Sequence, residues 1–157
     1  IDTNLTYAFP YNAVVSVLLI AGTVLIMVFY QTAGIKLSPE VAAKWSPEEW
    51  LLYLQALPES IDAADCQSLD ETFELTAQGN SEILVEWLRI AVASGYAPAV
   101  DRACDFLREM GRMKYLKPLY QTLAATPATR ERARALFAEV RDTYHPIAQM
   151  VVEGVLS

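Results

Sequence analysis

The sequence predicts an all-α protein, in which one N-terminal helix of membrane-spanning length precedes a stack of about seven short antiparallel helices. Three observations support this fold class. A twenty-residue apolar run lies near the N-terminus, helix-capping residues and prolines recur along the rest of the chain, and no alternating strand pattern is found there. We therefore expect two parts: residues 1–37, with the apolar helix at 11–30, and a helical-repeat domain over residues 38–157.

The apolar run extends from Tyr11 to Tyr30 and contains no charged side chain. Twenty residues at about 1.5 Å rise make a helix of about 30 Å, the thickness of a bilayer's hydrocarbon core. Aromatic residues lie at both ends, where their amphipathic rings favour the membrane interface. A secretory signal peptide, a β-hairpin and a helix buried inside a larger soluble protein remain alternatives. A single transmembrane helix is the interpretation that we favour.

The flanks of this run suggest an orientation. Lys36 and Lys44 follow it, whereas Asp2 is the only charged residue before it. The positive-inside rule then places the helical domain in the cytoplasm. The expected location is a membrane crossed once, with membrane lipid as a partner.

Residues that typically begin or end helices recur along the rest of the chain. Ser46 and Glu49 form a capping box with proline at the first helical position, and Asn80 or Ser81 precedes a strongly periodic run that ends at Gly95. We also expect Gly111 to end a helix in the left-handed conformation. The expected helices cover residues 47–57, 61–77, 81–94, 98–110, 115–125, 127–144 and 146–156.

Charge and cysteine content narrow the functional classes. The chain of 157 residues has a formal net charge of −7, which disfavours a nucleic-acid partner. Eleven acidic and one basic side chain fall within residues 37–86, whereas seven acidic and ten basic ones fall within residues 87–157. Cys66 and Cys104 have no CxxC spacing, so we expect buried free thiols rather than a disulfide or a zinc site.

No complete active site is found in the sequence. His145 is the only histidine, and a zinc hydrolase motif such as HExxH needs two at helical spacing. We expect His145 to start a helix instead. The chain has neither a GxSxG elbow nor a glycine-rich phosphate loop, so we predict no catalytic residue, metal site or cofactor.

The most suggestive polar cluster contains Arg112, Lys114 and Lys117 in the segment GRMKYLKP. Its basic residues lie between two expected helices, where backbone N–H groups and the helix dipole add to their attraction for a carboxylate or phosphate. A second basic set lies along the 127–144 helix, and we expect surface salt bridges there to Glu131 and Glu139. Its members are Arg130, Arg132, Arg134 and Arg141.

At this cluster the sequence resembles a known family. The segment GRMKYLKPLY, followed by LAA at 123–125, YHPI at 144–147 and MV at 150–151, is similar to the C-terminal helical domain of leukotriene hydrolase and the related HExxH zinc aminopeptidases. Upstream, NSEI at 80–83 and WLR at 87–89 fit the same domain, so the resemblance covers about residues 42–157. The apolar N-terminal run has no place in those enzymes.

The resemblance implies an armadillo-like superhelix that packs beside a catalytic domain and closes one end of its substrate cleft. It also implies that Arg112 and Lys114 help to hold the terminal carboxylate of a peptide. The family's zinc ligands and catalytic glutamate have no counterpart in this chain.

Two functional hypotheses follow. The first is a membrane-anchored, non-catalytic interaction or scaffold subunit, with other integral membrane proteins as partners. The alternative is the C-terminal domain of a zinc aminopeptidase, which acts together with an HExxH peptidase domain and binds the substrate's carboxylate. Neither hypothesis makes the chain an enzyme by itself.

Overall fold

The computed structural model describes residues 37–157, and every regular element within that range is helical. The all-α prediction is therefore confirmed for this part of the chain. The seven predicted helices correspond to α3 through α9, and one extra helical turn, α2, precedes them. The elements are α2 (Pro39–Ala42), α3 (Pro47–Ala56), α4 (Ala63–Phe73), the 3-10 helix η1 (Leu75–Ala77), α5 (Ser81–Ala93), α6 (Ala97–Glu109), α7 (Met113–Leu123), α8 (Pro127–Val140), the 3-10 helix η2 (Arg141–Thr143) and α9 (Pro146–Leu156).

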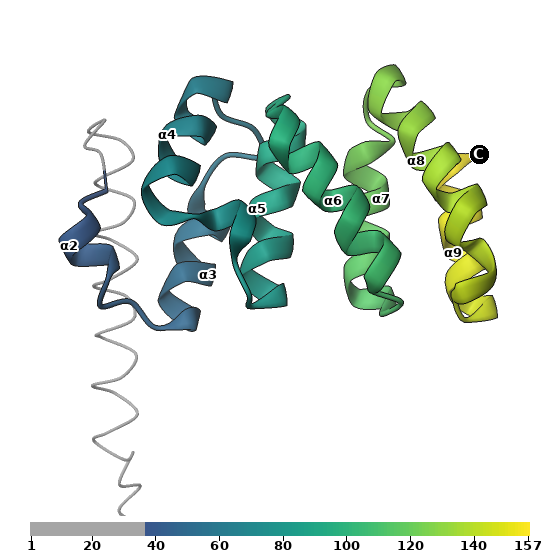
Figure 1. Ribbon diagram of the computed structural model, residues 1–157, viewed down its shortest axis with the longest axis horizontal. Helices are drawn as coiled ribbons and strands as arrows, with labels where there is room; N and C mark the ends of the chain where they lie inside the picture. The colour runs from purple at the N-terminus through teal and green to yellow at the C-terminus, as the bar shows by residue number, and fades with distance from the viewer. Residues whose placement is uncertain (1–36) are drawn as a thin grey trace, which may run out of the picture.

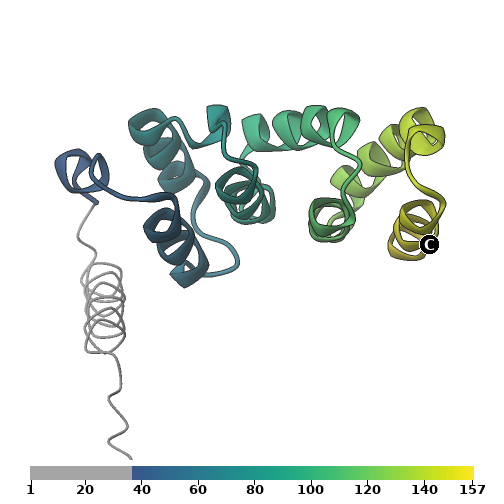
Figure 2. The same ribbon diagram turned by 90° about the horizontal axis from the view of Figure 1, so that it is seen from below.

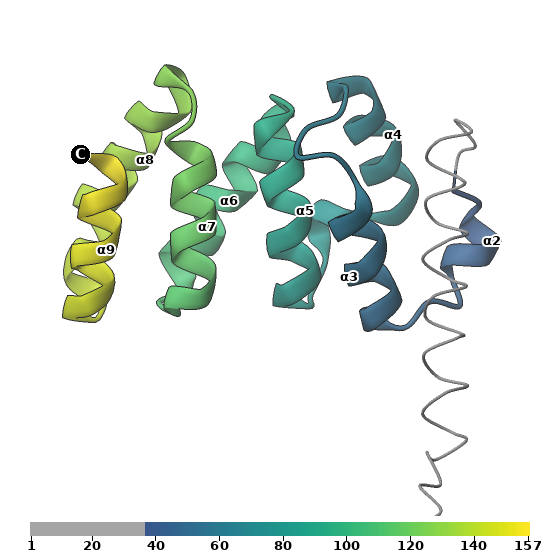
Figure 3. The same cartoon turned by 180° about the vertical axis from the view of Figure 1, so that it is seen from behind.

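The helices form two layers (Figure 1 and Figure 2). In the first layer α3, α5, α7 and α9 pack side by side in chain order, and in the second layer α4, α6 and α8 lie against them. Because each second-layer helix returns the chain, the first-layer helices all run in the same direction, as Figure 3 shows from behind. Their N-terminal ends therefore share one edge of the layer, and their C-terminal ends share the other.

Side-chain caps begin several of these helices where the sequence predicts them. Ser46 and Glu49 make the reciprocal bonds of a capping box before α3. The side chain of Asn80 accepts from the Glu82 amide to start α5, and His145 Nδ1 accepts from the Ile147 amide to start α9. These bonds satisfy amide groups that have no partner within the helix. The predicted role of His145 as a helix-start residue is confirmed.

One continuous apolar core joins the two layers. Trp87 of α5 and Tyr120 of α7 are fully buried at its centre, and every buried side chain within residues 37–157 is apolar or aromatic, or is a cysteine thiol. The Trp87 indole N–H donates to the Thr76 hydroxyl at 3.0 Å, which satisfies a polar atom of this buried ring. Cys66 and Cys104 are free and buried, as expected, and burial raises the pKa of both thiols.

The helix predicted over residues 61–77 is broken in the structure. Glu74 has a φ of 51°, so α4 ends at Phe73 and η1 follows in a new direction. The side chain of Asp70 accepts a bond from the Thr76 amide at 2.7 Å and another from the Tyr96 hydroxyl at 3.0 Å. These bonds fix the change of chain direction at Glu74, and Leu75, the next residue, is buried in the core.

The predicted left-handed conformation of Gly111 is wrong. Among the glycines within residues 37–157, only Gly95 has a positive φ, 76°. The helix before Gly111 ends at Glu109, and Met110, which follows it, has an extended backbone. The turn into α7 therefore proceeds through extended residues and needs no left-handed glycine.

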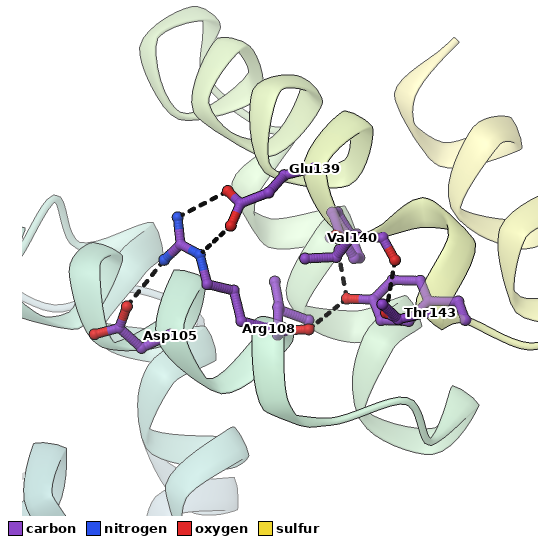
Figure 4. Close-up of polar contacts among 8 residues, drawn as sticks. Asp105, Arg108, Glu139, Val140 and Thr143 are labelled. Carbon is purple, nitrogen blue, oxygen red and sulfur yellow. Dashed lines mark hydrogen bonds and ion pairs between the residues drawn. The ribbon is translucent and has the colours of Figure 1, made fainter.

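The predicted basic set lies on α8 and, at Arg141, on η2, and it makes surface contacts, but not with the partners that we predicted. Arg132 pairs with Asp101 at 2.6 Å and Arg141 with Glu153 at 2.8 Å, while Glu139 pairs with Arg108 of α6. Figure 4 shows the Arg108 guanidinium between Asp105 and Glu139, with Val140 and Thr143 nearby. Two of these pairs join α6 to α8 within the second layer, and the pair of Arg141 with Glu153 joins η2 to α9.

The two remaining arginines of the set cap helix ends. Arg130 donates to the Ala124 carbonyl just beyond α7, and Arg134 donates twice to the Leu156 carbonyl at the end of α9. Both contacts satisfy carbonyl groups that a helix C-terminus leaves open.

The predicted membrane helix at Tyr11–Tyr30 lies outside the described residues. Within residues 37–157, no helix has both the length and the apolar character needed to cross a bilayer.

Candidate functional site

The predicted carboxylate-binding residues lie at the N-terminal edge of the first layer. Arg112 is the residue before α7, and Lys114 is in the first turn of that helix. The N-terminus of α5 is next to them, because α5 and α7 are neighbours in the layer and run in the same direction. Two helix N-termini, each with partial positive charge, therefore adjoin at this position.

A carboxylate of the chain itself occupies the centre of this site. The Lys114 ammonium contacts Glu82 Oε1 at 2.5 Å, and the Tyr115 hydroxyl donates to the same oxygen at 2.7 Å. Glu82 is in the first turn of α5. One carboxylate oxygen is thus held by a cation and a phenol from α7.

Arg112 lies beside this contact and has no ion pair with any residue of 37–157. Its guanidinium carbon is 5.8 Å from the centre of the Tyr115 ring, and the Lys114 nitrogen is 5.7 Å from the same ring. Both distances are within the range of cation–π attraction. Tyr115 therefore positions both cations on its ring while its hydroxyl binds Glu82.

These contacts shift the protonation equilibria of the site. The hydrogen bond from Lys114, followed by that from Tyr115, lowers the pKa of Glu82 below its ordinary value. The same carboxylate raises the pKa of Lys114 and of Tyr115. Glu82 is thus held as a carboxylate and Lys114 as an ammonium at neutral pH.

The structure brings Arg112 and Lys114 together and leaves Lys117 apart. Lys117 is exposed one turn further along α7, and among residues 37–157 it has no ion-pair partner. Sequence reasoning missed Glu82 and Tyr115 as members of the site. Tyr115 directly follows Lys114 and could have been found from that position. Glu82 is 32 residues before Lys114, and the two are neighbours only because α5 packs against α7.

The described residues offer no metal centre. No group of three His, Cys, Asp or Glu side chains within residues 37–157 could hold a metal ion.

Comparison with known proteins gives a consistent result. Residues 45–156 match the family described as leukotriene A4 hydrolase, C-terminal. Leucine aminopeptidase 2 of Neurospora crassa is 33% identical over 119 residues, which cover 74% of this chain and 18% of that protein. Leukotriene A-4 hydrolase of Xenopus laevis is 29% identical over 102 residues, covering 65% of this chain and 17% of that protein.

A further relative, leucine aminopeptidase 2 of Neosartorya fischeri, is 35% identical over 85 residues, covering 54% of this chain and 14% of that protein. The chain thus spans less than a fifth of the length of these relatives. The family match covers most of the chain and includes the whole of the basic cluster. The chain belongs to the leukotriene A4 hydrolase C-terminal family.

Proposed function

We propose that this chain is a non-catalytic helical domain that acts together with an HExxH zinc aminopeptidase domain and binds the terminal carboxylate of a peptide. The observation that carries the proposal is the Glu82 carboxylate, which lies between Lys114 and Tyr115 with Arg112 beside it. Glu82 neutralises one of the two positive charges of Arg112 and Lys114, and a second carboxylate neutralises the other. The similarity to leucine aminopeptidases supports a peptide as the ligand.

Each side chain has a definite part in this proposal. Arg112 is free to pair with the incoming carboxylate, and its planar guanidinium can bind both oxygens at once. Lys114 has three donors and one is on Glu82, so it can contact the ligand without leaving Glu82. Glu82 then keeps Lys114 near Arg112 rather than competing for the same site.

The test is binding of a small peptide to the full chain. An N-acetylated dipeptide with a free carboxyl group should bind, and its C-terminal amide should bind about tenfold or more weakly, because charge-assisted bonds are lost. Arg112→Met should reduce the affinity for the acid to that for the amide. Lys117→Met, a change of the same kind one turn along α7, is the control and should leave the affinity unchanged. Equal binding of acid and amide by the unaltered chain would refute the proposal.

The partner domain needs its own experiment. When the chain is combined with an HExxH peptidase polypeptide, we expect the two to co-purify. Arg112→Met should then raise KM for peptides while leaving kcat nearly unchanged, because it removes ground-state binding. A change in kcat alone would contradict carboxylate binding by Arg112.

A second function has one specific observation in its favour, the uncharged run from Tyr11 to Tyr30. In this function the chain is a single-pass scaffold subunit that holds its helical domain at a membrane, with lipid and integral membrane proteins as partners. A carbonate wash of membranes separates the two functions. Retention of the chain in the membrane pellet supports the scaffold, and release into the wash contradicts it.

A further inference from the structure

A surface hollow of about 560 Å³ lies at the opposite edge of the first layer, where α3, α5 and α7 end. Its volume is comparable with that of small-ligand sites, but it is open to solvent on one side. Leu57, Pro58 and Ala93 contribute the exposed apolar surface. The charged side chains of the lining are Glu59, Glu86 and Arg89. The hollow is one helix length from Arg112 and Lys114, so it is a separate feature.

One helix end around this hollow already has a cation, because Arg130 donates to the Ala124 carbonyl just beyond α7. None of α3, α5 and α7 carries a basic residue in its last turn. The C-terminus of α3 keeps the partial negative charge of its open carbonyl groups, and a cation placed there is stabilised. Pro58, which follows α3, has no N–H group to donate to them.

The side-chain charges favour a cation as well. Arg89 Nη1 contacts the two oxygens of Glu86 at 3.3 and 3.1 Å, so these two residues neutralise one another. Glu59 is exposed, and no cation within residues 37–157 pairs with it. The net charge of the residues that line the hollow is therefore negative, and Glu59 is the carboxylate that no cation among them neutralises.

From the volume, the apolar surface and the charge, we propose that this hollow binds a lysine or arginine side chain of a partner polypeptide. The aliphatic stem lies on Leu57, Pro58 and Ala93, and the charged end reaches Glu59 and the C-terminus of α3. The volume exceeds that of one side chain, which leaves room for the neighbouring residues of the peptide. We therefore assign the cation to a polypeptide rather than to a free amine.

The test uses an acetylated and amidated pentapeptide with a central lysine between leucines, titrated into the full chain. This peptide has no carboxylate, so its binding is independent of Arg112 and Lys114 and of the function proposed above. We expect it to bind about tenfold more tightly than the same peptide with norleucine in place of lysine. Equal affinities would overturn the proposal.

Two variants and a control locate the site. Glu59→Gln should weaken binding of the lysine peptide about tenfold, whereas Glu109→Gln, an exposed acid on α6, should change it less than twofold. Ala93→Phe places a ring in the hollow and should abolish binding. Because Glu59 and Ala93 are exposed, thermal melting should confirm that both variants fold. Unchanged binding in either variant would overturn the assignment.

A third arm distinguishes the source of the cation. Spermidine should bind at least tenfold more weakly than the lysine peptide, because it makes less contact with the apolar surface. Equally tight, Glu59-dependent binding of spermidine would identify a free amine as the ligand and would overturn the assignment to a polypeptide.

Discussion

The hydroxyl of Tyr144 makes a contact whose loss should have a measurable cost. Tyr144 is buried beside η2 and donates to the Leu107 carbonyl at 2.5 Å. This carbonyl is in the last turn of α6, where helix carbonyls lack partners within the helix. Because Tyr144 donates to Leu107, the Tyr120 hydroxyl, 3.4 Å away, must donate to the Tyr144 oxygen. One hydroxyl therefore satisfies two buried groups.

We expect Tyr144→Phe to lower the free energy of unfolding by about 2 kcal/mol. The change leaves the buried Leu107 carbonyl and the Tyr120 hydroxyl without partners, and each unsatisfied group costs about 1–3 kcal/mol before local relaxation. Tyr120→Phe is the matched control. It removes only the long 3.4 Å contact and should cost less than about 1 kcal/mol.

Urea denaturation followed by circular dichroism measures both values, with the slope of the transition checking that the unfolded states are comparable. The double variant should cost less than the sum of the single changes, because Tyr120 is no longer left without an acceptor. If Tyr144→Phe is no more destabilising than Tyr120→Phe, the reasoning from Leu107 is refuted.

Three further predictions concern other contacts. Glu74→Gly should raise stability by about 0.5–1 kcal/mol in the same denaturation assay, because glycine adopts a φ of 51° without strain; a loss of stability would contradict this. Burial, together with the hydrogen bond to Asp70, raises the pKa of Tyr96 from 10.0 to about 12. The protonated Tyr96 hydroxyl therefore contributes its full stabilisation below pH 10, and this stabilisation is lost as the pH rises toward 12. The urea midpoint of unfolding should fall less steeply over this interval in Tyr96→Phe than in the unaltered chain. Finally, Lys114→Met should raise the pKa of Glu82 toward its ordinary value in a carboxyl-carbon NMR titration, and an unchanged pKa would show that Lys114 is not its main partner.

Much of the fold is predictable from local sequence patterns. The capping box at Ser46 begins α3, and the strongly periodic run predicted after Asn80 forms α5. Its apolar face is buried at Leu84, Trp87, Leu88 and Ala91. Both signals depend on residues within one or two turns of each other, so they can be read without knowing the tertiary structure.

The features that could not be predicted depend on residues far apart in the chain. The break at Glu74 is held by Asp70, one of whose partners, Tyr96, is 26 residues away. The ion pair between Glu82 and Lys114 spans 32 residues, the separation of two neighbouring first-layer helices. The pattern of a single helix contains no information about which residue lies beside it in the next helix.

The common direction of the first-layer helices connects the two proposed sites. Their N-terminal edge holds Arg112 and Lys114 and suits an anion, whereas their C-terminal edge holds the hollow at Glu59 and suits a cation. The eleven residues of α7 span about 16 Å, the length of about five extended peptide residues.

If both sites act on one ligand, a peptide with a free carboxyl group and a lysine five residues before it should bind more tightly than a peptide with either group alone. Moving the lysine to the position next to the carboxyl group should remove this gain, because the shorter span cannot reach both edges. Calorimetric titration of the three peptides into the full chain measures the difference. Equal affinity at both spacings would show that the two edges bind separate ligands, each through the charge that its helix ends favour.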